Sequence, residues 1–174
     1  MNLTKLERLS LINQFEIRKR LEKTDAYDEW IKVLEEGYSL WYSEIFRNLS
    51  DDLSEEDCRF VSNVLSMYRA IHYYRQSAKE PLKDTTFAEF AGFSGNEEGH
   101  LRSFALFEIH KDNSWDEQKS REQETDRFNS HMPVRDVYER MLRVYKGLTL
   151  DAMSKLTKEQ VEQVLAAASY PGNK

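Results

Sequence analysis

The chain contains few of the residues that form turns between β-strands or that cross-link a small fold through disulfides. Among its 174 residues there are six glycines, three prolines and one cysteine, Cys58. So few turn-forming residues exclude an all-β protein with a turn about every ten residues. One cysteine cannot form a disulfide within the chain, which is typical of a reducing compartment. We therefore expect a hydrophobic core without covalent cross-links, which a chain of this length can bury.

Long apolar runs and excess positive charge are also missing. No apolar stretch approaches the ~20 residues of a membrane-spanning helix, and the charged N-terminus does not fit a signal peptide. We therefore expect a cytoplasmic protein with no membrane partner. The net charge of −6 disfavours a surface that coats nucleic acid, although it leaves a local basic patch open.

Apolar residues recur at spacings of three and four along most of the chain, which predicts an all-α protein. We expect a single multihelical domain over residues 1–174. The helices predicted at 54–75 and 94–110 are apolar around much of their circumference, so we place them in the centre. The polar segment 112–131 is predicted to be a mobile or weakly helical excursion, in which Glu117 and Arg121, four residues apart, can pair. A last helix is predicted at 158–169, with an apolar stripe of Val161, Val164, Leu165 and Ala168 and a stop at Pro171 and Gly172.

Three helix starts carry a capping box, in which a hydroxyl and a side chain three residues later satisfy free backbone N–H groups. The pairs are Thr4 with Glu7, Ser94 with Glu97, and Thr157 with Gln160. Pro133 is predicted at the first position of another helix. A further helical stripe is predicted between 38 and 49.

The first helix, predicted to end near residue 23, is apolar on two sides. One stripe consists of Leu6, Leu9, Asn13, Ile17 and Leu21, and the other of Leu11, Ile12 and Phe15. A helix of this kind needs two partners. Asn13, with Gln14 beside it, is a polar amide in an apolar seam, a feature that can fix the register and number of partners. We hypothesise a homotypic contact between copies; the alternative is that Asn13 caps a loop of its own chain.

The four histidines and the single cysteine show no metal-ligand spacing, and the sequence predicts no cofactor, metal site or catalytic residue. His72 falls on the apolar stripe of the 54–75 helix. A buried histidine is normally hydrogen-bonded within the core. The alternative is a general base or ligand in a small cleft, with Arg69 beside it.

Two basic clusters are candidates for nucleic-acid binding. The first consists of Arg18, Lys19 and Arg20, and the second includes Arg140 and Arg143. The first lies at a helix C-terminus, where cations interact favourably with the helix dipole. The second can form pairs four residues apart, Asp136–Arg140 and Glu139–Arg143, on a solvated face.

The order of several short motifs resembles the YfbU family. These are Arg8-Leu-Ser-Leu-Ile-Asn-Gln-Phe15, Glu36-Gly-Tyr38, Cys58-Arg59, Met67-Tyr68 with Ala70 and His72, Gly92-Phe93, Phe128-Asn129, and Tyr138 with Arg140-Met-Leu142. They keep their order from about Leu3 to Leu150, apart from 112–127. The resemblance implies an all-helical bacterial protein that self-associates. The resemblance implies no mechanism and no catalytic residues.

These observations favour a non-enzymatic, self-associating cytoplasmic protein that acts through protein partners and could be regulatory. The expected assembly is a homo-oligomer, a dimer or larger. One alternative is a nucleic-acid-associated protein that uses the basic clusters. A second is an enzyme with a small cleft near His72.

Overall fold

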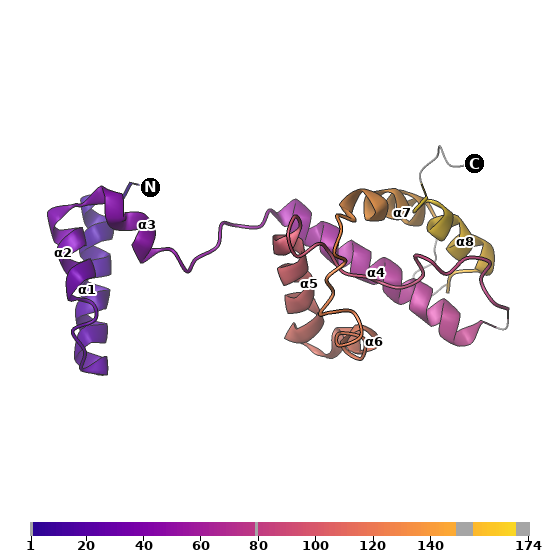
Figure 1. Ribbon diagram of the computed structural model, residues 1–174, viewed down its shortest axis with the longest axis horizontal. Helices are drawn as coiled ribbons and strands as arrows, with labels where there is room; N and C mark the ends of the chain where they lie inside the picture. The colour runs from indigo at the N-terminus through magenta and orange to yellow at the C-terminus, as the bar shows by residue number, and fades with distance from the viewer. Residues whose placement is uncertain (1, 79, 149–154, 170–174) are drawn as a thin grey trace. The chain divides into compact units, whose positions relative to one another are not determined.

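The computed structural model describes residues 2–78, 80–148 and 155–169. The described chain is helical, with one isolated β-bridge, so the prediction of an all-α fold is confirmed (Figure 1). It divides into two compact units, Met1–Asp52 and Leu53–Lys174. The single domain over 1–174 stays a prediction.

The first unit is built on a helical hairpin. Its elements are α1 (Lys5–Glu22), α2 (Asp28–Glu36), the 3-10 helix η1 (Ser39–Trp41) and α3 (Tyr42–Ile45). The capping box predicted for Thr4 and Glu7 is present, and α1 ends at Lys23 in the left-handed conformation. The core of the unit is Val33, Leu34 and Tyr42, against which Leu3, Leu11, Ile12, Phe15, Trp30 and Ile45 pack. The second stripe predicted for the first helix therefore faces this core.

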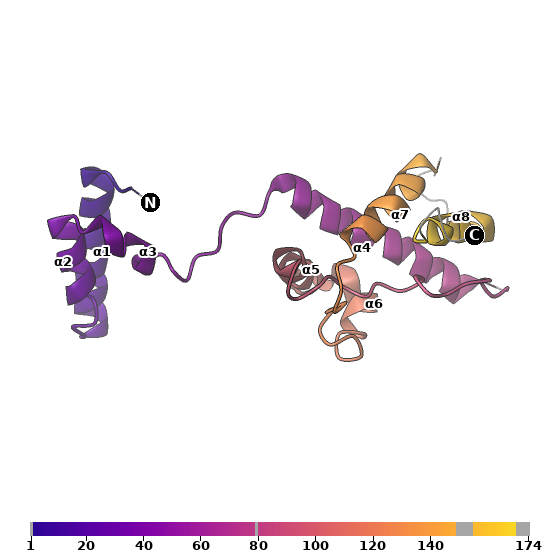
Figure 2. The same cartoon turned by 45° about the horizontal axis from the view of Figure 1, so that its top comes forward.

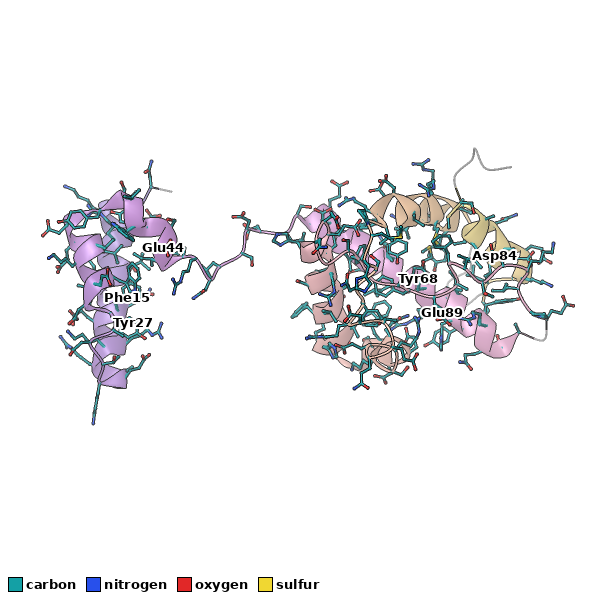
Figure 3. All side chains as sticks on the ribbon, in the orientation of Figure 1. Phe15, Tyr27, Glu44, Tyr68, Asp84 and Glu89 are labelled. Carbon is teal, nitrogen blue, oxygen red and sulfur yellow. The ribbon has the colours of Figure 1, made fainter. Side chains whose placement is uncertain are left out.

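Two contacts hold α1 and the chain after it together. The Arg8 guanidinium donates to the Leu34 carbonyl at 2.7 Å, which ties α1 to α2. The rings of Phe15 and Tyr27 are stacked with centroids 5.5 Å apart (Figure 3).

The second unit is organised around α4 (Glu55–Ser77). The other elements are α5 (Gly99–Lys111), the 3-10 helix η2 (Asn113–Trp115), α6 (Asp116–Lys119), α7 (Arg135–Gly147) and α8 (Lys158–Ala166). Helices α7 and α8 lie on one side of α4, and α5 and α6 on the other (Figures 1 and 2). Seven α4 side chains are buried: Val61, Val64, Leu65, Met67, Tyr68, Ile71 and Tyr74. This confirms the prediction of a buried central helix.

Aromatic side chains from four segments meet beside α4. They are Tyr68, Phe90, Phe93, Phe128 and Tyr138. The ring of Phe90 lies 5.3–5.9 Å from each of the other four, and Figure 3 labels Tyr68 at this position. The Tyr138 hydroxyl donates to the Gly92 carbonyl at 3.0 Å, so its polar atom is satisfied within the core.

The chain around Phe93 pairs with the end of the polar segment. Phe93 forms the isolated bridge with Asn129, and its N–H donates to the Phe128 carbonyl at 3.1 Å. Asp126, Arg127 and Phe128 all have left-handed backbone angles, φ 47°, 53° and 56°. Such residues cost about 1–2 kcal/mol each, so the contacts around them must hold them there. Arg102 does so by donating to the carbonyls of Arg127 and Asp126, each at 3.1 Å.

Glu98 is a buried carboxylate that joins two backbone segments. Its oxygens accept hydrogen bonds from the N–H groups of Ser94 at 2.9 Å, Val134 at 3.0 Å and Arg135 at 2.8 Å. Because the N-cap residue of α7, Val134, offers no side-chain cap, Glu98 satisfies free donors at this helix start. No local pattern in the sequence predicted this role, since the two segments lie 36 residues apart.

Several predicted helix limits are wrong. Helix α5 begins at Gly99 instead of Ser94, because the Ser94–Glu97 pair closes a turn before the helix. Pro133 lies two residues before α7. The helical stripe predicted between 38 and 49 is interrupted: only η1 and α3 form, and Tyr38, Trp41 and Leu49 are exposed. The apolar and aromatic residues of this segment are spaced as in a helix, although no continuous helix forms there.

The last helix agrees with the sequence more closely. The Thr157–Gln160 capping box is present, and Val161, Val164, Leu165 and Ala168 are buried as the stripe predicted. Helix α8 ends at Ala166, and 167–169 continue as a turn. The predicted stop at Pro171 lies outside the described residues.

The polar segment 112–131 is weakly helical, as one of its two interpretations predicted. It contains η2 and α6, and it contributes Trp115, Gln118 and Phe128 to the buried interior. Some of its charged residues form ion pairs with residues elsewhere in the second unit. The expected pair of Glu117 with Arg121 does not form, because α6 ends at Lys119; Glu117 binds Arg69 and Arg121 binds Glu89.

Candidate functional site

The side of α1 that faces away from α2 is an exposed apolar face. Its members are Leu6, Leu9, Asn13, Ile17 and Leu21, and we call it the α1 face. The four apolar side chains are 75%, 54%, 58% and 77% exposed, and Asn13 and its neighbour Gln14 are exposed as well. Helix α1 contains no buried residue, because its other side is only partly covered by the core of the first unit. The sequence predicted this face residue by residue.

Exposed apolar side chains are concentrated in the first unit. Of the eleven large hydrophobic residues that are exposed in the described chain, eight lie within residues 1–52: Leu6, Leu9, Ile17, Leu21, Tyr38, Leu40, Trp41 and Leu49. Scattered exposed apolar residues are normal, whereas a group on one helix face is typical of an interaction surface. The first unit is therefore where the structure concentrates candidate contact residues.

The basic residues at the end of α1 have acidic partners nearby. Arg18 binds Glu22 at 3.1 Å and lies over the ring of Tyr27. Lys19 is paired with Asp28, and the Arg20 guanidinium is 3.9 Å from Glu16. These partners neutralise much of the cluster's charge, so it presents little net charge to a phosphate backbone.

Arg140 and Arg143 differ from each other in their surroundings. The half-buried Arg140 guanidinium donates to the carbonyls of Ala167 at 3.2 Å and Ala168 at 2.8 Å. It thus binds carbonyls at the end of α8 and holds that helix against α7. Arg143 is exposed. The structure therefore uses one of these two predicted basic residues for packing.

His72 lies beside a small cavity of about 20 Å³. The ring is half-buried at the edge of the α4 stripe, and no described residue forms a hydrogen bond with it. Glu89, Gln118 and Arg121 also line the cavity. Pockets for organic ligands measure about 300–1,000 Å³. The space beside His72 is therefore far too small for such a substrate.

Arg69 lies outside that cavity. Its guanidinium binds Glu117 at 2.9 Å and stacks over the Trp115 ring at 3.6 Å. Both partners belong to the polar segment, so Arg69 fastens this segment to α4. The structure does not bring the two predicted cleft residues, His72 and Arg69, to one site.

A wider open groove of about 880 Å³ runs between α4 and α7. Phe60 and Leu142 contribute apolar surface, and charged side chains of both signs line its walls. Arg135 neutralises two of the nearby carboxylates, binding Asp57 at 2.7 Å and Glu139 at 2.9 Å. Two carboxylates at this groove are therefore already paired with a guanidinium group.

The Asp57–Arg135 pair links the start of α4 to the start of α7. The Arg135 guanidinium and the Ser54 hydroxyl, in that order, hold the pKa of Asp57 below its ordinary value of 3.8. A carboxyl whose pKa is lowered by folding stabilises the folded state above its ordinary pKa. That contribution is lost as the pH falls through the lower, folded value.

We therefore expect Asp57→Asn to destabilise the protein by about 0.5–1 kcal/mol at neutral pH, since the pair is partly exposed. Urea unfolding at a series of pH values measures this difference, which should shrink as the pH falls below 3.8 and through the lower folded pKa of Asp57, because position 57 is then uncharged in both proteins. Asp51→Asn is the matched control, since Asp51 has no ion pair in the described chain. A difference that stays constant with pH would contradict the assignment.

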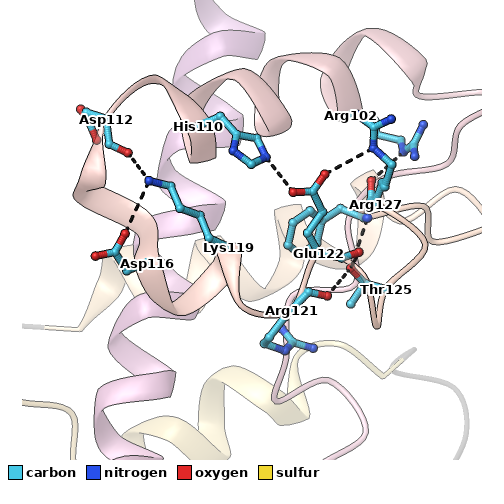
Figure 4. Close-up of polar contacts among 10 residues, drawn as sticks. Arg102, His110, Asp112, Asp116, Lys119, Arg121, Glu122, Thr125 and Arg127 are labelled. Carbon is cyan, nitrogen blue, oxygen red and sulfur yellow. Dashed lines mark hydrogen bonds and ion pairs between the residues drawn. The ribbon is translucent and has the colours of Figure 1, made fainter.

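A polar network fastens the polar segment to α5 (Figure 4). His110 and Glu122 are in contact at 2.7 Å, and Arg127 binds the same carboxylate at 3.3 Å. The Lys119 ammonium donates to the Asp112 carbonyl at 2.7 Å. These contacts join the polar segment to α5 and to itself, and their partial exposure makes a stabilising role the simplest account.

Within the described parts of the chain, no three side chains of His, Cys, Asp or Glu are grouped as metal ligands. The same residues include no helix with the length and apolar character to cross a membrane.

Comparison with known proteins identifies the family. A family model described as the YfbU domain matches residues 1–167. The chain belongs to the YfbU family. It is 36% identical over 170 residues to the UPF0304 protein MJECS11 of Methanocaldococcus jannaschii, an alignment that covers 95% of this chain and 99% of that protein. The resemblance found in the short motifs is thus confirmed for the chain as a whole.

Family membership does not assign a function to this YfbU-family chain. Neither the family description nor the printed name of the relative states an activity. The relative is archaeal, so membership alone does not confirm the bacterial source that the resemblance implies.

Proposed function

We propose that this YfbU-family protein is a self-associating, non-enzymatic cytoplasmic protein, that it acts through protein contacts, and that the α1 face is its self-association surface. The single observation that carries the proposal is the exposure of four large apolar side chains on the side of α1 opposite its intramolecular partner. Fully burying a side chain of this size contributes about 1.5–3 kcal/mol. Covering the exposed fraction of all four would stabilise an assembly by several kcal/mol.

A second copy of the same face suits this surface for two reasons. The five residues of the face are uncharged, and the adjacent charges, Glu16 and Arg20, have opposite signs and lie 3.9 Å apart, so like charges contribute little repulsion between two copies. At its middle, the Asn13 amide offers both a donor and an acceptor. Two such amides can therefore form reciprocal hydrogen bonds across a two-fold axis, where each residue meets its own copy. An apolar residue at this position would lack that means of fixing register.

Nucleic-acid binding has weaker support. Arg18, Lys19 and Arg20 have acidic neighbours within the first unit, and Arg140 binds carbonyls at the end of α8. An enzymatic site at His72 is also disfavoured, because the adjoining cavity admits little more than a water molecule. These features favour the protein-contact proposal over both alternatives.

The double variant Leu9→Glu/Ile17→Glu tests the surface. It should weaken self-association at least 100-fold, about 2.7 kcal/mol, because four carboxylates would be buried without partners. Light scattering with size-exclusion chromatography measures the mass over a range of concentrations. Circular dichroism should show unchanged helix content, since both residues are exposed in the folded chain.

Two further variants make the test specific. Leu40→Glu alters an exposed leucine outside α1 and should leave the mass unchanged. Asn13→Leu should change the oligomer number or broaden its distribution, because the amide no longer specifies register. Finding the same oligomer and the same stability in Asn13→Leu would refute the role of Asn13, and a monomeric wild-type chain would refute the proposal itself.

A further inference from the structure

The side-chain oxygen of Gln118 has no hydrogen-bond partner among the described residues. Gln118 lies in α6 and is 2% exposed, and its Oε1 atom is shielded from bulk solvent. A buried amide oxygen without a donor is costly, and folded proteins leave few such atoms unsatisfied. The oxygen therefore points to a molecule that donates a hydrogen bond to it.

Gln118 lines the cavity beside His72, which restricts the size of that molecule. The cavity volume is about 20 Å³. A single water molecule needs about 10–15 Å³ of such space, so one water fits and a ligand of several heavy atoms does not. Tyr68 and Phe90 form part of the wall, and the Tyr68 hydroxyl is directed to the Met141 sulfur at 3.7 Å.

The charges around the cavity favour a neutral molecule. Arg75 and Arg121 each donate to Glu89, at 2.7 Å, and Arg121 also donates to the Phe90 carbonyl at 3.3 Å. The hydrogen bond from Arg75, then the charges of Arg121 and Arg75, lower the pKa of Glu89, which stays ionised. A cation would face two guanidinium groups, and an anion would face a carboxylate and the Gln118 oxygen. Water is compatible with both kinds of neighbour.

We infer that the cavity is a specific hydration site, in which one water molecule donates to Gln118 Oε1 and joins it to the polar groups around His72. Buried waters of this kind make about three hydrogen bonds each. The His72 ring and the Glu89 carboxylate also line the cavity and can complete the set. The site concerns the second unit and is independent of the α1 face. It ties the polar segment, through α6, to α4 and to the chain at 88–90.

The variant Gln118→Met distinguishes a hydrated site from a dry one by whether the midpoint of thermal unfolding falls or does not fall. Methionine keeps the length of the side chain and removes its hydrogen-bonding atoms. If a water is bound, it loses a partner, and the midpoint of thermal unfolding should fall by about 3–5 °C. An unchanged or higher midpoint would overturn the inference, because removing an unsatisfied oxygen relieves its cost. Gln123→Met, at an exposed position of the same segment, is the matched control.

A second measurement does not depend on how the variant folds. A crystal structure of the wild-type chain, at a resolution that shows ordered water, should contain a water within about 3.2 Å of Gln118 Oε1. Water-oxygen magnetic relaxation should show one fewer long-lived water in Gln118→Met. The inference would be overturned if that crystal structure showed a protein group, instead of a water, donating a hydrogen bond to Gln118 Oε1.

Discussion

Gly92→Ala should lower the free energy of unfolding by about 2–5 kcal/mol. Gly92 has φ +94°, a conformation that costs a residue with a side chain about 1–2 kcal/mol. An added methyl group would also lie 1.9 Å from the Phe128 carbonyl oxygen. That oxygen is backbone and accepts the Phe93 N–H, so it cannot move without breaking the bridge. Overpacking of this kind adds about 1–3 kcal/mol.

Urea unfolding of Gly92→Ala beside the wild-type chain measures the loss, with Gly147→Ala as the control. A methyl group on Gly147 meets no atom within 4 Å, and its φ is not positive. This control should be neutral or stabilise by up to about 1 kcal/mol, because alanine reduces the entropy of the unfolded chain. Equal effects of the two substitutions would show that the close approach of Gly92 to Phe128 is not a constraint. Protein concentration must be held constant, since self-association adds to apparent stability.

Glu98→Gln should destabilise the protein by about 2–4 kcal/mol. The carboxylate accepts three backbone N–H bonds, one from Ser94 on Oε2 and two, from Val134 and Arg135, on Oε1. An amide has one oxygen, so its NH₂ group must face at least one N–H donor. A buried donor left unsatisfied costs about 1–3 kcal/mol, and the charge-assisted strength of the remaining bonds is lost as well.

Glu97→Gln is the matched control for Glu98→Gln. Glu97 is adjacent and exposed, and its carboxylate contacts the Ser94 hydroxyl. The amide oxygen of glutamine can still accept from this hydroxyl, so Glu97→Gln should cost less than about 1 kcal/mol. Unfolding of both variants in urea gives the comparison directly. If Glu98→Gln cost no more than Glu97→Gln, the carboxylate would not be the cap of α7.

The comparison of sequence with structure is most favourable on α1. The positions of Leu6, Leu9, Asn13 and Ile17 were predicted to share one face, and they do, because the period of a helix depends only on local backbone geometry. The same reasoning predicted the buried stripe of α4 and the caps at Thr4 and Thr157. Each of these features involves residues within a few positions of one another.

The prediction was less successful where the partner of a residue lies far along the chain. Glu117 was paired with Arg121 by spacing, yet it binds Arg69, 48 residues away. Arg140 was placed on a solvated face, yet its guanidinium binds carbonyls at the end of α8. His72 was placed on a buried stripe, and it proves to be half-buried beside a small cavity. Long charged side chains can reach several alternative partners, and only packing selects one.

The sequence by itself determined the all-α class, the family and the two-sided first helix, because helical periodicity and capping are local properties of the chain. The tertiary structure alone decided that Glu98 caps α7, that Gly92 meets Phe128, and that the polar segment contributes Gln118 and Trp115 to the interior. Each of these contacts joins segments that are distant in sequence, and their pairing is fixed by how the helices pack around α4.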